Sequence, residues 1–302
     1  MGPVEAKLSA RDARFDAGPG ARLDDAARAA LEARGLRLDG GRRVVTVRAG
    51  DGVAGVAVWQ IQGFESAELG LATGRIEAIQ AWKPDEDAHV LADLAARTVS
   101  DMKNEGIALA ACRLPEARIG AVNALESAGF GMIECLLTLA RPLAGAPKMP
   151  TGIGLAVAGE GEDCARLAGR CFMADRFHTD PRIADSAADR LKEAWIRNSA
   201  KGRADAMLVA RRDGRVVGFN ACMRNGTTAV IDLIGVAPEA QGQGHGRALV
   251  EGALAHYAAA GAAEMAVGTQ SGNFASLALY QSCGFRIRSS QFTLHAHLGE
   301  NR

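Results

Sequence analysis

The chain has 302 residues, which is long enough for two domains of ordinary size. Lys and Arg together number 35, as do Asp and Glu together, so the formal net charge is zero. This balance provides no general attraction to nucleic acid or to an anionic membrane. A hydrophobic fraction of 48% is typical of a soluble globular protein.

The first half begins with an extension, residues 1–40, which is rich in Ala, Arg and Asp and contains one expected helix at 23–34. Recurring β-branched residues between 43 and 61 then predict two strands around the turn Gly50-Asp51-Gly52. The elements expected after them are strand 74–79, helix 85–105, strand 107–112, helix 117–128 and strand 130–139.

Prolines and glycines predict a linker at 143–152. After it we expect a strand near 153–157, helices at 162–173 and 186–198, and strands at 207–211, 216–223 and 228–236. The dipeptides Asp213-Gly214 and Asn225-Gly226 are typical of the hairpin turns between these strands. The last elements expected are helix 247–259, strand 264–268, helix 274–282 and a strand from 285.

A weak internal repeat relates the two halves. The segments IALAACRLPEARIGAVNALESAGFGMIE and AEMAVGTQSGNFASLALYQSCGFRIRS both predict a strand, a loop, a helix, Gly-Phe and a strand. Aligning the two Gly-Phe pairs places Leu125 opposite Tyr280. We therefore expect two related α/β domains, at 41–142 and 153–298, of which only the second carries a glycine-rich loop.

The cysteines and the apolar runs exclude several other classes. The six cysteines show no CxxC spacing and lie in apolar segments, which argues against a disulfide framework and against a zinc site. No run of about 18 apolar residues predicts a membrane span. Residues 1–14 lack the apolar core of a signal peptide. We expect a cytoplasmic protein that needs no metal.

The glycine-rich loop carries the functional argument. A strand ending at Val236 is followed by Gln241, Gly242, Gln243, Gly244, His245 and Gly246, and then by an amphipathic helix. Such a loop exposes backbone N–H groups at a helix N-terminus, where the helix dipole favours a pyrophosphate. The spacing is neither the GxGxxG of a dinucleotide-binding fold nor a P-loop, which needs Gly-Lys-Ser/Thr. A glycine-rich turn without a ligand is the plain alternative.

The pattern Q-x-x-G-x-G after a β-strand resembles the acetyl-CoA pyrophosphate motif of the GNAT acetyltransferase superfamily. This resemblance implies a tandem GNAT-like α/β fold, with a mixed, mostly antiparallel twisted sheet flanked by helices and a degenerate N-terminal half. It implies acetyl-CoA as co-substrate and Tyr280 as the acid that protonates the departing thiolate; a phenol with a pKa near 10 suits that task. The residues it places at acetyl-CoA are Leu233, Ile234, Gly235, Val236, the loop residues Gln241 to Gly246, Arg247 and Asn273.

A narrower resemblance extends over most of the chain. DRFHTDPRIADSAADRLKEAWIRNSAKGRAD, together with AGFGMIECLLTL and VGTQSGNFASLALYQSCGF, is similar to the dTDP-fucosamine N-acetyltransferase group. Those enzymes acetylate the amino group of a nucleotide-linked 4-amino-4,6-dideoxy sugar. The resemblance does not include the first 40 residues, and the substrate of this chain does not follow from it.

The acceptor amine must lose a proton, and three groups are candidates for the base. Glu134 occupies the matching acidic position after Gly-Phe in the sugar-amine group. Asp232 lies on the strand before the loop, on the opposite face from Ile231 and Leu233. Water is the third candidate. The plain alternative for Glu134 is a solvated strand carboxylate, and that for Tyr280 is a buried aromatic residue.

The acceptor itself is expected near Arg176, Phe177 and His178, in the loop that forms part of the acceptor site in GNAT enzymes. An Arg there can pair bidentately with a nucleotide diphosphate, or it can be an ordinary surface residue. Partners are therefore expected to be small-molecule amines, not nucleic acid or membrane. The N-terminal half would complete the acceptor cleft or bury the surface of a homodimer.

Three functions remain open on the sequence alone. The first is N-acetylation of a nucleotide-sugar amine by direct transfer. The second keeps acetyl-CoA but changes the acceptor to a protein N-terminus, an amino acid, a polyamine or an antibiotic. The third is an acyl-CoA-binding regulator without catalysis, which fits the N-terminal half better than the C-terminal half because only the latter has Tyr280 and the loop.

Overall fold

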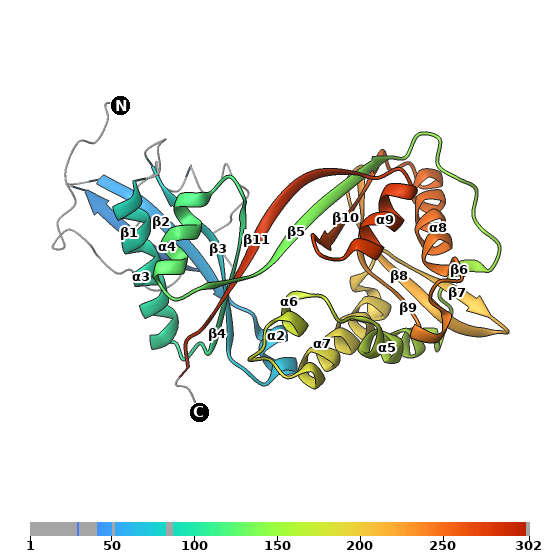
Figure 1. Cartoon of the computed structure of the whole chain (residues 1–302), viewed down its shortest axis with the longest axis horizontal. Helices are drawn as coiled ribbons and strands as arrows, with labels where there is room; N and C mark the ends of the chain where they lie inside the picture. The colour runs from blue at the N-terminus through green and yellow to red at the C-terminus, as the bar shows by residue number, and fades with distance from the viewer. Residues whose placement is uncertain (1–28, 30–40, 50–51, 83–86, 300–302) are drawn as a thin grey trace. The chain divides into compact units, whose positions relative to one another are not determined.

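The computed structural model describes residue 29 and residues 41–49, 52–82 and 87–299 (Figure 1). Apart from residue 29, the predicted extension 1–40 lies outside the described residues, as do Gly50 and Asp51 of the first predicted turn. The described residues form two compact units. The first consists of the residues up to Ile133 together with those from Gln291, and the second is Glu134–Ser290.

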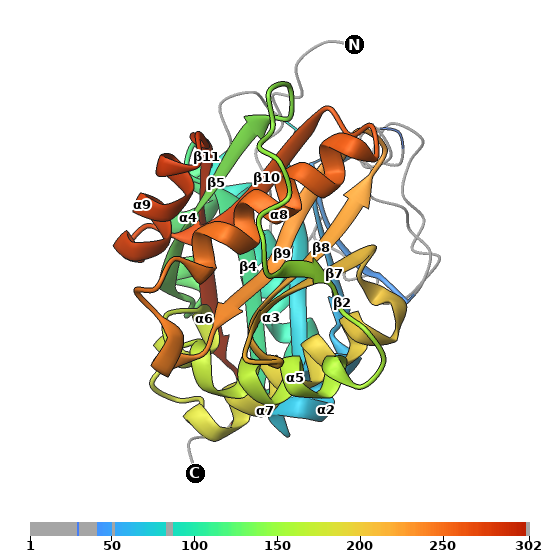
Figure 2. The same ribbon diagram turned by 90° about the vertical axis from the view of Figure 1, so that its right-hand side faces the viewer.

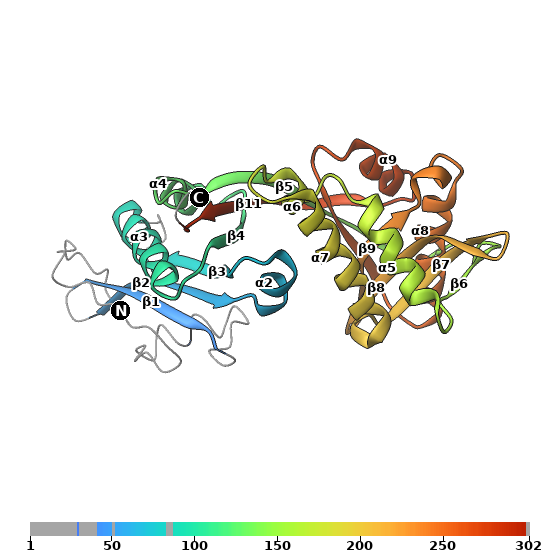
Figure 3. The same ribbon diagram turned by 90° about the horizontal axis from the view of Figure 1, so that it is seen from below.

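The first unit contains a mixed sheet with its helices α3 and α4 on one side (Figure 3). Its strand order is β1 (Arg43–Ala49), β2 (Gly52–Ile61), β3 (Thr73–Ala81), β4 (Leu109–Pro115) and the later part of β11 (Arg286–His297). Neighbouring strands are antiparallel except β3 and β4, which are parallel. The helices are α2 (Gly63–Leu69), α3 (Ala88–Asn104) and α4 (Ile119–Ser127).

Helix α3 packs closely on this sheet because apolar residues recur along it at helical spacing. Gly55 in β2 permits the approach, since a Cβ there would lie 2.6 Å from Val90 and 2.9 Å from Leu94. Asp87 begins the helix, and its carboxylate accepts the backbone N–H groups of His89 at 3.0 Å and Val90 at 3.3 Å. The N-terminus of α3 is thus closed by an acidic side chain.

The second unit is a larger sheet covered on both faces (Figure 2). Its strand order is β5 (Gly131–Pro142, from Glu134 on), β10 (Glu264–Gln270), β9 (Thr228–Val236), β8 (Arg215–Asn225), β7 (Ala206–Arg212) and β6 (Ile153–Leu155). Only β9 and β10 are parallel. The helices are α5 (Glu160–Cys171), α6 (Arg176–Thr179), α7 (Asp185–Asn198), η1 (Ser199–Arg203), η2 (Pro238–Ala240), α8 (His245–Ala259) and α9 (Phe274–Ser282).

Alternating residues of β7 divide the core of this unit into two layers. Leu208 and Ala210 belong to a cluster with α8, whereas Met207 and Val209 belong to a cluster with α5 and α7. Helices α5 and α7 therefore cover one face of the sheet, and α8 covers the other. The predicted α/β class with a mixed, mostly antiparallel sheet flanked by helices is confirmed.

The final strand of each half pairs in the sheet of the other unit. Strand β5 follows α4 in the chain, yet its residues 136–142 pair with β10. Strand β11 follows α9, yet its residues 291–297 pair with β4. This is the arrangement that two copies of one fold produce when they exchange their last strand. Neither half can be separated from the chain without removing a strand from a sheet.

The structure differs from the predicted elements in a few places. Helices α2 and α6 are absent from the prediction, because one or two helical turns carry too little periodicity to be recognised. Asn225 pairs with Thr228, so the loop of this hairpin is Gly226-Thr227 and not Asn225-Gly226. The helix after the glycine-rich loop begins at His245, two residues before the expected start. Among the described residues, every helix is too short or too polar to span a bilayer.

Candidate active site

Strands β9 and β10 lie side by side only at their beginnings. Their parallel pairing joins residues 228–231 of β9 to residues 264–267 of β10. Beyond these residues β10 stays paired with β5, and β9 stays paired with β8 through Val236. We call this divergence the β9/β10 fork. In the described sheet, the edge of β9 after Ile231 has no strand partner on the β10 side, and such an edge can bond to an extended ligand.

A β-bulge stands where the fork opens. Ala221 of β8 pairs with Leu233 and Cys222 pairs with Ile231, so Asp232 has no Cα partner on β8. The segment Leu233–Val236, predicted to contact acetyl-CoA, follows the bulge directly. Within it, a Cβ at Gly235 would collide with Cys171 of α5, so the helix covers this part of the strand closely.

The glycine-rich loop ends in a helix N-terminus that no side chain caps. Gly242 and Gly244 have φ angles of 74° and 86°, and an added Cβ at either glycine would have no neighbour within 4 Å. They are thus required for backbone conformation, and the space beside them is open. The first helical bond of α8 runs from Ala248 N–H to Gly244 O at 3.0 Å. The N–H groups of the preceding turn have no helical acceptor and can bind an anion.

Side chains of the loop bond to the protein itself. Gln241 donates to Val236 O at 3.2 Å, and Gln243 donates to Glu239 O at 3.1 Å. Arg247 donates to Ser282 Oγ at 2.8 Å, which directs its guanidinium toward α9. These bonds fix the loop, so the contact with an anion is left to backbone N–H groups, including that of His245 as the first residue of α8.

Tyr280 is almost completely buried in the core cluster between α8 and α9. Burial raises the pKa of its phenol, and the thiols of Cys222 and Cys283 add to the effect. The phenol therefore stays protonated at neutral pH and can donate a hydrogen bond. Tyr280 belongs to the same core cluster as Ile231 and Cys222, which pair where the fork opens.

Asn273 has a role that the sequence did not indicate. It is the N-cap of α9, and its Oδ1 accepts the backbone N–H of Ser276 at 3.2 Å. Its side-chain N–H₂ group still has donors to offer a ligand.

The two acidic candidates are both engaged with other side chains. Glu134 is buried, and its Oε2 accepts a hydrogen bond from Gln270 Nε2 at 3.0 Å. Asp232 is partly exposed and forms an ion pair with Arg203, with 2.6 Å between Nη1 and Oδ2. Each carboxylate is therefore held in one orientation.

The three predicted acceptor residues form the single turn of α6. Arg176 and Phe177 are buried, and the guanidinium of Arg176 lies over the Phe177 ring at 4.2 Å from its centroid. The ring of His178 is held between two carboxylates, with Nδ1 at 2.6 Å from Asp175 and Nε2 at 3.1 Å from Asp189. Arg176 is thus not the surface residue of the plain alternative.

A buried lysine supports this turn from α7. Lys192 Nζ lies 3.3 Å from Asp175 Oδ1 and between 5.3 and 5.7 Å from the ring centroids of Phe172, Phe177 and Trp195. Burial lowers the pKa of Lys192, and Asp175 opposes this effect. Burial alone would raise the pKa of Asp175, but His178 and Lys192 lower it to about 2. Asp175 therefore stays charged and holds α6 in place.

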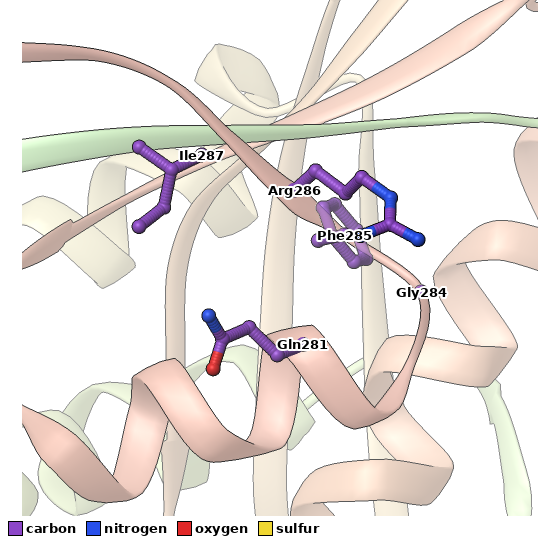
Figure 4. Close-up of a pocket in the computed structure, with 5 residues that line it drawn as sticks. All are labelled: Gln281, Gly284, Phe285, Arg286 and Ile287. Atoms are coloured by element: carbon purple, nitrogen blue, oxygen red, sulfur yellow. The ribbon is translucent and has the colours of Figure 1, made fainter.

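A hollow of about 280 Å³ lies beside the end of α9, lined by Gln281, Gly284, Phe285, Arg286 and Ile287 (Figure 4). None of the predicted site residues lines it. The Phe285 ring contacts that of Tyr280, with centroids 5.8 Å apart, so the wall of this hollow supports the tyrosine from behind. Among the described residues, no three His, Cys, Asp or Glu side chains gather closely enough to hold a metal ion.

Comparison with known families decides what this geometry belongs to. The model of the acetyltransferase (GNAT) family matches residues 166–285, which include the fork, the loop and Tyr280. Residues 166–285 belong to the GNAT acetyltransferase family. The match contains every predicted site residue except Glu134.

Three relatives are similar over about half to two thirds of this chain. The spore coat polysaccharide biosynthesis protein SpsD of Bacillus subtilis (strain 168) is 27% identical, covering 62% of this chain and 66% of SpsD. The dTDP-fucosamine acetyltransferase of Escherichia coli O6:H1 is 29% identical, covering 61% of this chain and 79% of the relative. The mycothiol acetyltransferase of Thermobispora bispora is 30% identical, covering 53% and 57%. The chain thus matches less than two thirds of the length of SpsD and of the mycothiol enzyme.

Solved structures share the fold over longer stretches. A GCN5-related N-acetyltransferase from Sphaerobacter thermophilus has a TM-score of 0.64, with 18% identity and coverage of 98% of both chains. A tandem GNAT protein from the clavulanic acid biosynthesis pathway has a TM-score of 0.55 and 14% identity. The similarity covers 86% of this chain and 84% of that protein. These similarities confirm the predicted tandem GNAT-like fold.

Sequence analysis missed the residues that support the predicted site from a distance. Lys192 and Asp175 lie 17 residues apart, and Arg203 and Asp232 lie 29 apart, so no local pattern joins them. One signal was available: a lysine on the buried face of the amphipathic helix α7 needs a nearby carboxylate.

Proposed function

We propose that the chain is an acetyl-CoA-dependent N-acetyltransferase whose catalytic domain is residues 153–298. We further propose that it acetylates the amino group of a nucleotide-linked amino sugar by direct transfer.

The observation that carries the proposal is the combination of an open strand edge and an uncapped helix N-terminus at the end of the same strand. Strand β9 leaves β10 after Ile231, and α8 begins nine residues after the end of β9 without a side-chain cap. An extended ligand with amide groups and a pyrophosphate, such as CoA, suits both features. The open space at Gly242 and Gly244 fits an anion that approaches the backbone closely.

The chemistry assigns a task to each group around the fork. The thioester supplies the acetyl group, and the backbone N–H groups of β9 after the bulge stabilise the negative charge that forms on its oxygen. Glu134 or water accepts the proton that the amine must lose. Tyr280 donates its proton to the departing sulfur, a role that its neutral, buried phenol supports.

The acceptor class rests on two supports. Two of the relatives are named for polysaccharide biosynthesis and for dTDP-fucosamine acetylation. The buried Arg176 on α6 supplies a fixed positive charge, which suits a phosphate-bearing acceptor. A different amine is the alternative, which the similarity to a mycothiol acetyltransferase favours.

The proposal is tested by measuring free-thiol release from acetyl-CoA with a panel of amines. The panel includes dTDP- and UDP-linked 4-amino-4,6-dideoxy sugars, the corresponding free amino sugars, and amino acid, polyamine and peptide amines. We expect turnover with a nucleotide sugar and at least tenfold lower kcat/KM with the free sugar. Turnover restricted to another amine would replace the acceptor class. Acetyl-CoA binding without turnover of any amine would instead favour a non-catalytic binding protein.

A further inference from the structure

We infer that Arg203 and Asp232 form a positioning pair that holds the β9 bulge in place, and that Asp232 is not the general base. The inference rests on the proposed function, because it assigns the role of a residue within that site. It adds Arg203, which lies outside the expected site, to the residues on which the reaction depends.

The contact ties the opening of the fork to the end of α7. Arg203 Nη1 lies 2.6 Å from Asp232 Oδ2 and donates to Ser199 Oγ at 3.3 Å. Arg203 is the last residue of η1, a π-helical turn that contains Gly202 at a φ angle of 106°. Since Asp232 is the bulged residue of β9, this ion pair joins the π-helical turn after α7 to the bulge of β9.

A row of charged and aromatic side chains continues from this pair to α6. The Trp195 ring has Arg203 at 5.6 Å and Lys192 at 5.3 Å from its centroid. Lys192 in turn contacts Asp175, which caps α6. The turn that carries Arg176 and His178 and the bulge of β9 are therefore supported by one continuous set of contacts.

The first unit contains a similar ion pair at a bulge, and there it accompanies the bulge without a catalytic site. Val58 of β2 pairs with Ala78 and Trp59 pairs with Ile76, so Glu77 is the bulged residue of β3. Its Oε2 lies 2.5 Å from Arg42 Nε.

The two bulges occupy equivalent positions. The residues of β3 and β9 correspond with a constant separation of 155, which matches Glu77 to Asp232. No glycine-rich loop follows β3, so a catalytic role cannot explain the carboxylate there. An acidic side chain held by an arginine is the feature common to both bulges, and it is independent of the loop.

The test is a double-mutant cycle in the full chain with Asp232→Asn, Arg203→Met and the double variant. Four quantities are measured: the Kd of acetyl-CoA by calorimetry, kcat and KM with the best amine, and the pH dependence of kcat/KM. Arg203→Lys keeps the charge, and Arg42→Met with Glu77→Gln is the matched pair in the first unit.

We expect each single change to lower kcat about tenfold and to weaken acetyl-CoA binding several-fold. The double variant should be no worse than either single variant, and Arg203→Lys should recover part of the loss. The acidic limb of the pH profile should persist in Asp232→Asn. The matched pair in the first unit should leave kcat unchanged.

Two results would overturn the inference. One is a loss of kcat of about 10³-fold or more in Asp232→Asn with the acidic limb gone, while Arg203→Met stays near the wild type; Asp232 would then be the base. The other is additive losses in the cycle, which would mean that the two side chains act independently. If the wild type turns over no amine, acetyl-CoA affinity still reports the coupling, so failure of the proposed function is seen separately.

Discussion

The two units contain the same fork, but they differ in the residues that surround it. In the first unit, β3 and β4 are parallel over residues 73–76 and 109–112, and Glu77 forms the bulge. In the second unit, β9 and β10 are parallel over 228–231 and 264–267, and Asp232 forms the bulge. Every position of the first fork recurs 155 residues later. The strand pairing is therefore the same in both units, whereas the glycine-rich loop occurs only in the second.

The helix that follows each fork begins differently. In the first unit the carboxylate of Asp87 accepts two N–H groups at the start of α3. In the second unit the N-cap of α8 is Gly244, which has no side chain to accept them. An acidic cap satisfies the groups that would bind a pyrophosphate and repels its charge. The residue type at the N-cap thus distinguishes the capped helix α3 from α8, where we propose that an anion binds.

In the first unit, an arginine side chain also bonds to the strand edge at the fork. Arg118 Nη2 donates to Ile79 O at 3.0 Å, at the strand segment that follows the bulge. The constant separation matches Arg118 to Asn273, whose shorter side chain caps α9 instead. It also matches Leu125 to Tyr280, so the first unit lacks the phenol. The comparison teaches that few residues at the fork distinguish the proposed ligand site from its counterpart in the first unit.

The largest effect should come from removing the hydroxyl group of Tyr280, since the corresponding residue of the first unit, Leu125, is apolar. We expect Tyr280→Phe to bind acetyl-CoA with nearly wild-type affinity and to lower kcat about 10²-fold or more, the scale of losing a general acid. Steady-state kinetics and calorimetry measure the two quantities. The matched change Leu125→Met in the first unit should leave both unchanged. Equal turnover of Tyr280→Phe and the wild type would show that Tyr280 is not the acid.

The next largest effect should come from placing an acidic N-cap on α8. We expect Gly244→Asp to weaken acetyl-CoA binding about 10²-fold, since the carboxylate occupies the free N–H groups and repels the pyrophosphate. Gly244→Asn is the matched control, because it has the same shape and the same backbone strain without the charge. We expect about tenfold tighter binding by Asn than by Asp at low salt. Acetyl-CoA affinities of both variants equal to that of the wild type would contradict the loop as the pyrophosphate site.

The sequence predicted those parts of the fold that local patterns specify. The strand 228–236 was located to the residue, because its turn signals and the glycine-rich loop bound it on both sides. The correspondence of TGRIEAIQA in β3 with TAVIDLIGV in β9 is also present in the sequence, but it becomes recognisable only when the bulges are aligned.

Contacts between distant residues could not be predicted in this way. The support of α6 by Lys192 and the exchange of β5 and β11 join segments far apart in the chain, and no periodicity encodes them. Asp232 was predicted as a candidate base, yet its partner Arg203 lies in a turn of irregular backbone that propensities do not foresee.

A smaller effect concerns the pH dependence of thermal stability, which should change on replacing His178 of the second unit but not His89 of the first. The hydrogen bond to Asp175 raises the pKa of His178, burial opposes it, and the contact with Asp189 adds to the rise. Because the pKa in the folded state is above the ordinary value of about 6.5, this stabilisation is complete at lower pH and is lost as the pH rises through the raised pKa. The temperature of the unfolding midpoint should therefore decrease as the pH is raised above about 6.5. This decrease should be smaller in His178→Asn than in the wild type. The exposed His89 of α3 provides the control, as His89→Asn should keep the wild-type profile; equal profiles for all three would exclude His178 as the cause.

The smallest effect concerns the closed helix of the first unit. We expect Asp87→Ala to lower the free energy of unfolding by about 1 kcal/mol, the usual result of losing an N-cap, since two N–H groups of α3 lose their acceptor. Acetyl-CoA affinity and kcat should not change, because the proposed site lies in the second unit. Denaturant unfolding and calorimetry on the same preparations separate the two results. A second equivalent of acetyl-CoA bound by Asp87→Ala would show that the acidic cap alone keeps the first unit from binding, and that Arg118 does not fill the fork tightly enough to prevent it.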